Sequence, residues 1–308
     1  MTTWGVVATV KAPRGEILDF AAHHLELGAQ RVYLYLDAPD PGTLAALKTH
    51  PKVRVVACDD AYWQRQGRRP VKHQVRQGRN ATHAYRRRAE VDWLAHVDVD
   101  EFLWPETRVA DALAALPSGV LSARVHPMEA LAGDGTAFKA LIPKADRAEV
   151  TARLYPTYGA HLRAGFLSHV AGKLFVRTGL EGVELRIHNM FVGEAQNPHS
   201  VDLGQVALCH LHARPFGQWL DSYRYRLSRG SYRAELAPAR PRAEGGLTLH
   251  ELFRALEAAG GEAALRSFFD EVCADSPSLR DRLAREGLLR HIDLDLSASR
   301  RRQFPEFD

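Results

Sequence analysis

Apolar runs alternate with helix-like segments through the first hundred residues of the chain. Short apolar runs, typical of buried strands, cover residues 4–10, 31–36, 52–58 and 92–100. Segments whose apolar residues recur at helical spacing lie between them, at residues 15–28, 43–51 and 71–91, the last interrupted only by Gly78. Strands and helices that alternate in this way predict βαβ units, and therefore an α/β fold with a mixed, mostly parallel sheet flanked by helices.

The pattern changes after Pro117. Strand-like runs separated by glycine-rich turns follow, at residues 119–128, 172–179, 183–190 and 205–213. Helical patterns return at residues 216–236 and 248–289, on either side of a Pro/Ala/Arg-rich linker at residues 237–246. We predict one domain over residues 1–235, with halves at 1–110 and 111–235, and a linker with a helical C-terminal extension over residues 236–308.

Composition and charge narrow the class of protein. The 308 residues are 45% hydrophobic and 25% charged, which is typical of a globular protein. The net charge of +4 and a pI near 9.0 favour an anionic partner. Three widely spaced cysteines without a CxxC pair argue against a disulfide framework or a cysteine zinc site, and fit a reducing compartment. No run reaches the length of a membrane span or a signal sequence, so we expect a cytoplasmic protein.

The stretch DWLAHVDVDEFLWP at residues 92–105 places Asp98, Asp100 and Glu101 at the end of an apolar run. Side chains two apart on a strand project to the same side, so Asp98 and Asp100 can share one cation. Mg²⁺ and Mn²⁺ prefer such oxygen ligands and commonly bridge to substrate phosphates. The alternative is an acidic strand end that caps a helix or pairs with arginines. Open α/β sheets bind ligands at the carboxyl ends of their strands, where this cluster is expected.

Several blocks of the chain, in the same order, resemble family 2-like glycosyltransferases. The segment RNATHAYRRRAEVDWLAHVDVDEF (79–102) resembles the part in which an "RN" helix precedes an apolar strand ending in DxD. The segment EILDFAAHHLELGAQRVYLYLDAPDPGT (16–43) resembles the start of that group, and SHVAGKLFVR and CHLHAR resemble later blocks. The resemblance covers roughly residues 4–235. Residues 11–13 and 37–42 depart from the family's pattern.

The resemblance implies a GT-A (Rossmann-like) fold and a nucleotide-sugar donor, for which we expect a UDP-sugar. Residues 1–110 would then form the nucleotide-binding half and residues 111–235 the acceptor-side half. Asp98 would contact the ribose or a divalent cation, Mn²⁺ or Mg²⁺, and Asp100 would ligate that cation. Asp37 or Asp40 would hold the base or ribose, although Asp40 is equally explained as an ordinary turn residue.

Basic residues supply further candidates for the donor site. Arg76, Arg79 and His83 share one face of the predicted helix, and this face could meet the donor diphosphate. Arg79 and Asn80 match the family's "RN". By contrast, Arg86, Arg87 and Arg88 are predicted to form a solvated face or to contact acidic lipid. Lys173 follows a glycine, which lets a ligand approach the backbone. It would neutralise a phosphate, or else be an exposed lysine at a strand end.

Two histidines are candidates for a further ligand to the cation. His210 and His212 alternate on one predicted strand and so share a face. Imidazole suits Mn²⁺ moderately, so the pair could complete a carboxylate site. The alternative is that each is a core histidine bonded to a carbonyl group.

Direct displacement with inversion needs a carboxylate that accepts the proton of the acceptor hydroxyl. Glu129 precedes a glycine-rich loop and is the first candidate for this base, with Glu101 the second and Asp134 a rival. We expect an inverting enzyme.

Two functions from different classes remain. The first is a metal-dependent glycosyltransferase of bacterial polysaccharide biosynthesis, acting on a glycan or lipid-linked acceptor, with peripheral contact at the inner face of the membrane. The second is a non-enzymatic protein that binds acidic lipid or nucleic acid and has a structural DxD. No nucleic-acid-binding motif is present, and no GxxxxGK[ST] loop supports a nucleotidyltransferase. The sequence therefore favours the enzyme, with no nucleic-acid partner, and leaves the oligomeric state open.

Overall fold

The computed structural model describes residues 1–87, 89–229, 232, 234 and 236–307. Arg88 and the predicted boundary residue 235 lie outside this range. The chain forms two compact units, which we name unit 1 (Met1–His126, Ala171–Leu208 and Leu294–Asp308) and unit 2 (Pro127–Val170 and Cys209–Asp293). Each unit is built from separate stretches of chain, and the domain division predicted at residue 235 stays a prediction. The functional halves stay a prediction.

Unit 1 is built on four parallel strands: β1 (Trp4–Val10), β2 (Arg31–Leu36), β3 (Val53–Ala57) and β4 (Trp93–His96). β1 lies between β2 and β4, and β3 pairs with the outer edge of β2. Every residue of β1 is buried, as expected for a parallel strand covered on both faces. The predicted strands at residues 4–10 and 31–36 are confirmed.

Antiparallel strands extend this sheet. β8 (Lys173–Arg177) pairs with β4, and the first half of β6 (Ser122–Ala130) pairs with β8. The remaining strands of unit 1 are β5 (Glu101–Pro105), β9 (Val183–Leu185), β10 (Met190–Val192), β11 (Ala195–Gln196) and β12 (Ser200–His210), which ends in unit 2. The predicted mixed α/β fold is confirmed.

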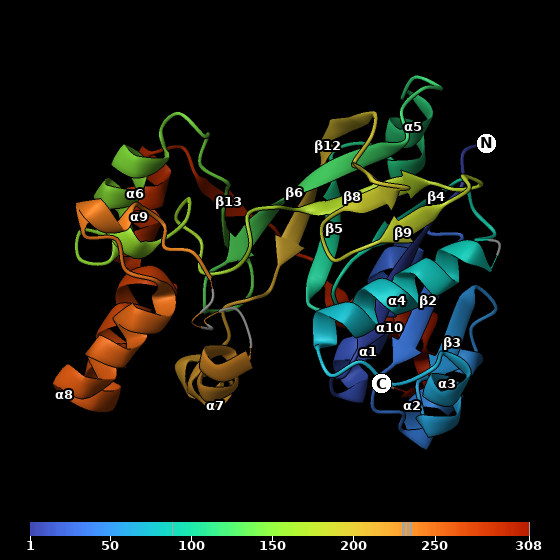
Figure 1. The fold of residues 1–308 in the computed structure, drawn as a ribbon, viewed down its shortest axis with the longest axis horizontal. Coiled ribbons are helices and arrows are strands. Elements are labelled where there is room, and N and C mark those ends of the chain that lie inside the picture. Colours follow the sequence, from blue (N-terminus) through green and yellow to red (C-terminus); the bar gives the residue numbers. More distant parts are fainter. Residues whose placement is uncertain (88, 230–231, 233, 235, 308) are drawn as a thin grey trace. The chain divides into compact units, whose positions relative to one another are not determined.

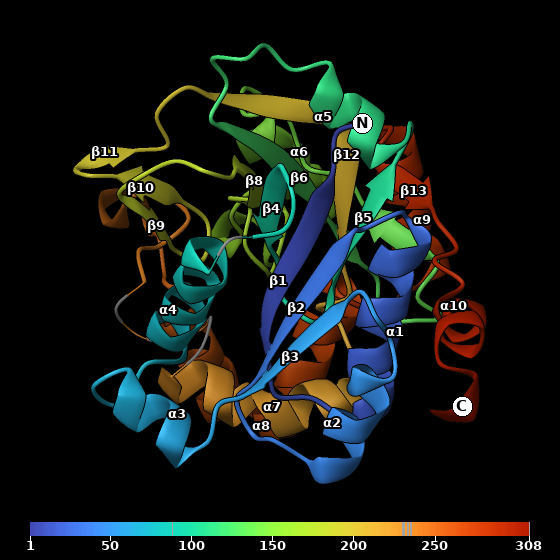
Figure 2. The same cartoon turned by 90° about the vertical axis from the view of Figure 1, so that its right-hand side faces the viewer.

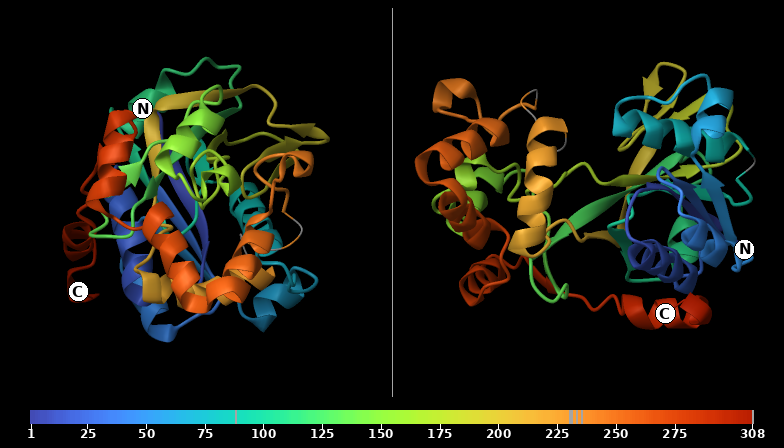
Figure 3. Two further views of the ribbon diagram at one scale, coloured as in Figure 1. Left: turned by 90° about the vertical axis from the view of Figure 1, so that its left-hand side faces the viewer. Right: turned by 90° about the horizontal axis from the view of Figure 1, so that it is seen from below.

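Helices cover both faces of the parallel strands. The helices of unit 1 are α1 (Arg14–Glu26), α2 (Pro41–Lys48), α3 (Asp60–Arg65), α4 (His73–Arg86), α5 (Val109–Ala114), α10 (Leu296–Gln303) and the short 3₁₀ helix η3 (Pro305–Phe307). α3 and α4 lie on one side of β1–β3, and α1 and α2 lie on the other (Figure 2). α10 lies beside α1 (Figure 3), where Arg300 contacts Asp19 at 3.1 Å.

Helix α4 runs through Gly78 without the predicted interruption. A Cβ atom at this position would lie 2.9 Å from the carbonyl oxygen of Leu185, so glycine lets α4 pack closely against β9. Arg86 and Arg87 are exposed, as predicted.

Unit 2 combines a small antiparallel sheet with helices. The second half of β6 pairs with β7 (Ala137–Lys139), which pairs with β13 (Leu289–His291). The helices, seen in Figure 1, are α6 (Arg147–Leu154), η1 (Gly159–His161), α7 (Phe216–Arg229), η2 (Arg242–Glu244), α8 (Leu249–Val272) and α9 (Pro277–Arg285). Trp219 and Tyr223 on α7 are 0% and 1% exposed, which fits their helical i, i+4 spacing and places both in the core.

Among the described residues, no helix is long and apolar enough to span a membrane.

Candidate donor site

The acidic cluster forms a turn in unit 1. β4 ends at His96 and β5 begins at Glu101, so the predicted strand over residues 92–100 is too long. The Glu101 amide donates to the Asp98 carbonyl at 3.1 Å, and the Glu101 carboxylate accepts the Asp98 amide at 2.7 Å. We name residues 98–101 the acidic turn. Because Asp98 and Asp100 lie in a turn, the strand rule does not establish that their side chains project to one side.

The Asp98 carboxylate is held by two donors. One oxygen accepts a hydrogen bond from the Gln77 amide of α4, and the other lies 2.7 Å from the Lys173 ammonium. Burial would raise the pKa of Asp98, but the charge and hydrogen bond of Lys173 together with His96 lower it. The side chain keeps 21% of its surface exposed. Asp98 is therefore ionised, oriented and open to solvent on one side.

Lys173 and Glu101 form the buried floor of the acidic turn. Both side chains are 0% exposed, and the Lys173 ammonium lies 3.4 Å from the Glu101 carboxylate. Burial would lower the pKa of Lys173, but Asp98 and Glu101 raise it. The alternative of an exposed strand-end lysine is therefore wrong. The ammonium is directed at protein carboxylates, and its predicted phosphate contact stays untested.

A second carboxylate lies at the carboxyl end of β2. Asp37 is 2% exposed and is bound by two arginines, Arg69 at 3.0 Å and Arg76 at 2.9 Å. By contrast, the exposed Asp40 caps α2, accepting the Thr43 amide at 2.7 Å. The structure thus gives Asp40 the contacts of an ordinary turn residue and Asp37 those of a built polar site.

Helix α4 contributes a positive end to this region. Its first turn contains no acidic residue, and its N-cap residue Lys72 makes no side-chain capping bond. His73 lies within electrostatic range of both Asp37 and Asp98, although burial lowers its pKa. Unsatisfied amides and the helix dipole favour anions at such an end. Arg76, three residues along the same face, extends the positive region.

The two residues of the predicted "RN" pair, Arg79 and Asn80, lie in different surroundings on α4. Asn80 is fully buried, where it accepts from the Tyr62 hydroxyl at 2.7 Å and donates to the Thr9 hydroxyl at 3.0 Å. Arg79 is exposed and donates to the Arg68 carbonyl at 3.3 Å. The sequence predicted Arg76, which lies three residues before Arg79 on the same helix face, but gave no signal for Arg69 or Gln77.

Glu129 lies in a buried ion pair inside unit 2. It is 1% exposed, contacts the Lys139 ammonium at 2.6 Å, and accepts the amides of Leu167 at 3.2 Å and Ser168 at 2.6 Å. Burial would raise the pKa of Glu129, but Lys139, His212 and Ser168 together lower it to about 2. A carboxylate with these contacts is a weak proton acceptor. Asp134 is paired locally with Thr136 at 2.9 Å.

The histidines of unit 2 lie close together. His210 ends β12, and its ring centroid is 5.1 Å from that of His212 and 5.2 Å from that of His169. His212 lies beyond the strand, and its Nε2 atom is 3.4 Å from the Arg226 guanidinium. Asp98 and Asp100 belong to unit 1 and these histidines to unit 2. A cation site shared by them stays a prediction.

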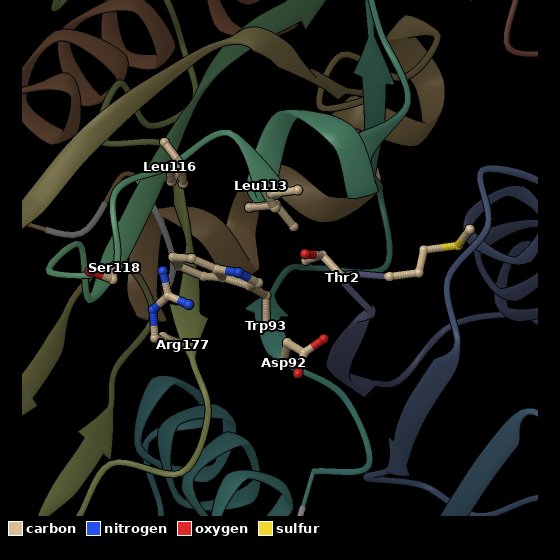
Figure 4. Close-up of a pocket in the computed structure, with 9 residues that line it drawn as sticks. Thr2, Asp92, Trp93, Leu113, Leu116, Ser118 and Arg177 are labelled. Carbon is tan, nitrogen blue, oxygen red and sulfur yellow. The ribbon is translucent and has the colours of Figure 1, made fainter.

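An open surface cleft of about 480 Å³ lies at the other end of β4 (Figure 4). Its two charged side chains already have protein partners: Asp92 accepts the Thr3 amide at 2.7 Å, and Arg177 donates to the Val120 carbonyl at 2.9 Å. The Arg177 guanidinium also stacks 4.4 Å from the Trp93 ring centroid. The lining is therefore explained by the fold, and the acidic turn is the stronger candidate.

Comparison with known proteins points to one class of enzyme. Residues 10–116, about a third of the chain, match the model of glycosyltransferase family 92. No curated protein matches the chain. Similar solved structures include HddC from Yersinia pseudotuberculosis (12% identity, 58% of this chain and 75% of that chain, TM-score 0.29). A mycobacterial protein is another (15% identity, 90% and 76%, TM-score 0.33).

These TM-scores are too low for either likeness to bear on the fold or function. The family match spans Asp37, α4 and the acidic turn. It supports a glycosyltransferase.

Proposed function

We propose that this protein is a metal-dependent, inverting glycosyltransferase with a GT-A fold, which transfers a sugar from a nucleotide diphosphate, a UDP-sugar, to a glycan or lipid-linked acceptor. The observation that carries the proposal is the family match over residues 10–116, because that segment holds Asp37, the amino end of α4 and the acidic turn. The acidic turn is the DxD motif of this enzyme.

The donor lies along the carboxyl ends of β2 and β4 in this proposal. Asp37, held by Arg69 and Arg76, faces the nucleoside, and carboxylate oxygens accept hydrogen bonds from base or ribose. The amino end of α4 binds the diphosphate through its unsatisfied backbone amides, and Arg76 and His73 supply further hydrogen-bond donors to it. Arg79 and Asn80 are second to these groups, because Arg79 is bonded to a neighbouring loop and Asn80 is buried.

A divalent cation fits the acidic turn by the chemistry of its donors. Asp98 and Asp100 supply hard oxygen ligands, and the Asp98 oxygens keep lone pairs beyond their contacts with Gln77 and Lys173. When bound, the cation neutralises charge on the departing diphosphate. His210 or His212 would supply a further ligand. The protein's own part is to hold Asp98 ionised and oriented for the donor.

The catalytic base of the inverting reaction is not Glu129 in this proposal. Its carboxylate is buried in the ion pair with Lys139 and has a pKa of about 2. Glu101 is also fully buried and shapes the acidic turn. Asp100, half-buried in the same turn, is the carboxylate we assign to the cation. The base in this proposal is therefore a carboxylate other than these three.

Calorimetric titration of UDP and GDP, each with Mn²⁺ or with EDTA, tests the donor site. We expect one nucleotide to bind only with Mn²⁺, Asp100→Ala to abolish binding, and Asp111→Ala, an exposed aspartate of α5, to bind normally. Release of free sugar from the matching nucleotide sugar would then identify the donor.

The opposite outcome favours the non-enzymatic function. If neither nucleotide binds, while a DNA duplex or vesicles containing phosphatidylglycerol do, the acidic turn is structural and the glycosyltransferase proposal fails. Peripheral contact with the inner face of the membrane is tested by the same vesicles.

A further inference from the structure

We propose that Lys173 is a positioning residue of the donor site, which orients the Asp98 carboxylate before nucleotide or cation arrives. The effect of Lys173 on nucleotide binding rests on the function proposed above. The effect of Lys173 on the orientation of Asp98 in the ligand-free protein does not depend on that function.

The position of Lys173 is set by a close backbone contact. Gly172, with φ of +67°, precedes it, and a Cβ atom there would lie 2.1 Å from the Val125 carbonyl oxygen. Only glycine therefore lets β8 begin against β6 at this point. Lys173 is the first residue of β8, and its side chain starts from a strand paired on both sides.

The Lys173 ammonium contacts one fully buried carboxylate and one partly exposed carboxylate. It lies 3.4 Å from the Glu101 carboxylate, which is 0% exposed, and 2.7 Å from the Asp98 carboxylate, which is 21% exposed. Glu101 in turn accepts the Asp98 amide. The backbone of the acidic turn and the side chain of Asp98 are thus held by the same buried pair.

A second anchor acts on the other oxygen of Asp98. Gln77, 3% exposed on α4, donates its side-chain amide to that oxygen. With both oxygens held, the carboxylate has one orientation, and the entropy of ordering it is lost during folding rather than during binding. Lys173 therefore contributes to donor affinity without touching the donor.

The experiment separates orientation from charge balance. Asp98, Glu101 and Lys173 together carry one net negative charge, and so does the double variant Lys173→Met/Glu101→Gln. The side-chain oxygen that Glu101→Gln retains can still accept the Asp98 amide, so the variant removes the Lys173–Asp98 contact and spares the backbone bond. It also avoids the unpaired buried carboxylate that Lys173→Met alone would leave.

The matched control is Lys139→Met/Glu129→Gln, which removes the buried pair of unit 2. We measure the Kd for UDP with Mn²⁺, the melting temperature, and the Gln77 side-chain amide resonances without ligand, assigned with Gln77→Ala. We expect the Lys173 double variant to bind UDP ~10-fold or more weakly and to shift the Gln77 resonances. The control should leave both unchanged.

Gln77 resonances that stay at their wild-type positions overturn the proposal, as does a UDP Kd within twofold of wild type in a protein that binds UDP. If the wild-type protein binds no nucleotide, the proposed function fails, and the Gln77 resonances still decide whether Lys173 orients Asp98.

Discussion

In the described part of the chain, Lys139 and Lys173 are almost completely buried, and each lies beside a buried glutamate. Lys139 in unit 2 contacts Glu129 at 2.6 Å, and Lys173 in unit 1 lies 3.4 Å from Glu101. The partners beyond each pair differ. Lys139 donates to the carbonyl groups of Val272 and Gly165, at 3.1 and 3.4 Å, all inside unit 2.

Lys173 instead reaches a carboxylate that is open to solvent, Asp98. Asp98 also lies near the positive end of α4, through Gln77 and His73. A buried ion pair is therefore weak evidence for a functional site by itself. What distinguishes the pair in unit 1 is that one member extends to a surface where other polar groups converge.

Removing the ammonium of unit 2 should give the largest change in stability. Lys139→Met leaves Glu129 charged, buried and without its counter-ion, and breaking such a pair costs about 3–5 kcal/mol. We expect urea denaturation to show this loss while the folded protein binds nucleotide normally. A loss below about 1 kcal/mol, or weaker nucleotide binding, would remove the distinction between the two pairs.

Lowering the pH from 7 should destabilise unit 1 before it weakens the Glu129–Lys139 ion pair. Burial and the neighbouring His23 lower the pKa of His24 to about 3, against 6.5 in the unfolded chain, although Glu101 partly opposes them. The unfolded state therefore binds the extra proton first, and stability falls as the pH drops below about 6.5. For His24 this amounts to about 2 kcal/mol at pH 5.

The pKa of Glu129 is about 2 in the folded protein and 4.5 in the unfolded chain, so its stabilising contribution is lost only as the pH falls below about 4.5. Thermal melts at pH 7, 6 and 5 measure the loss of stability that His24 causes. The variant His24→Leu should reduce the slope of the melting temperature against pH. Equal slopes in the wild type and this variant would contradict the assignment.

The smallest effect is expected at the turn after β2. Asp40→Ala removes the side-chain cap of α2 and should lower the melting temperature by ~3 °C. Because Asp40 caps a helix while Asp37 is held by two arginines, the Kd for UDP should stay within twofold of wild type. A tenfold weaker Kd would instead make Asp40 part of the nucleotide site.

Much of the fold was predictable because it depends on local patterns. The strands at residues 4–10 and 31–36 match their predicted bounds, since short runs rich in β-branched and aromatic residues and bounded by turn residues favour strands. The acidic turn was harder to predict from the sequence. His96 ends β4 two residues before Asp98, where backbone pairing stops, and periodicity cannot detect that point.

The sequence by itself determined the alternation of strands and helices, the location of the acidic cluster after a buried strand, and the resemblance to glycosyltransferases. Tertiary structure decided which charges meet. Lys173 is 75 residues from Asp98, and Arg76 is 39 residues from Asp37. Pairings over such distances arise when strands and helices pack, and burial then determines whether a charge is paired, oriented or left to the solvent.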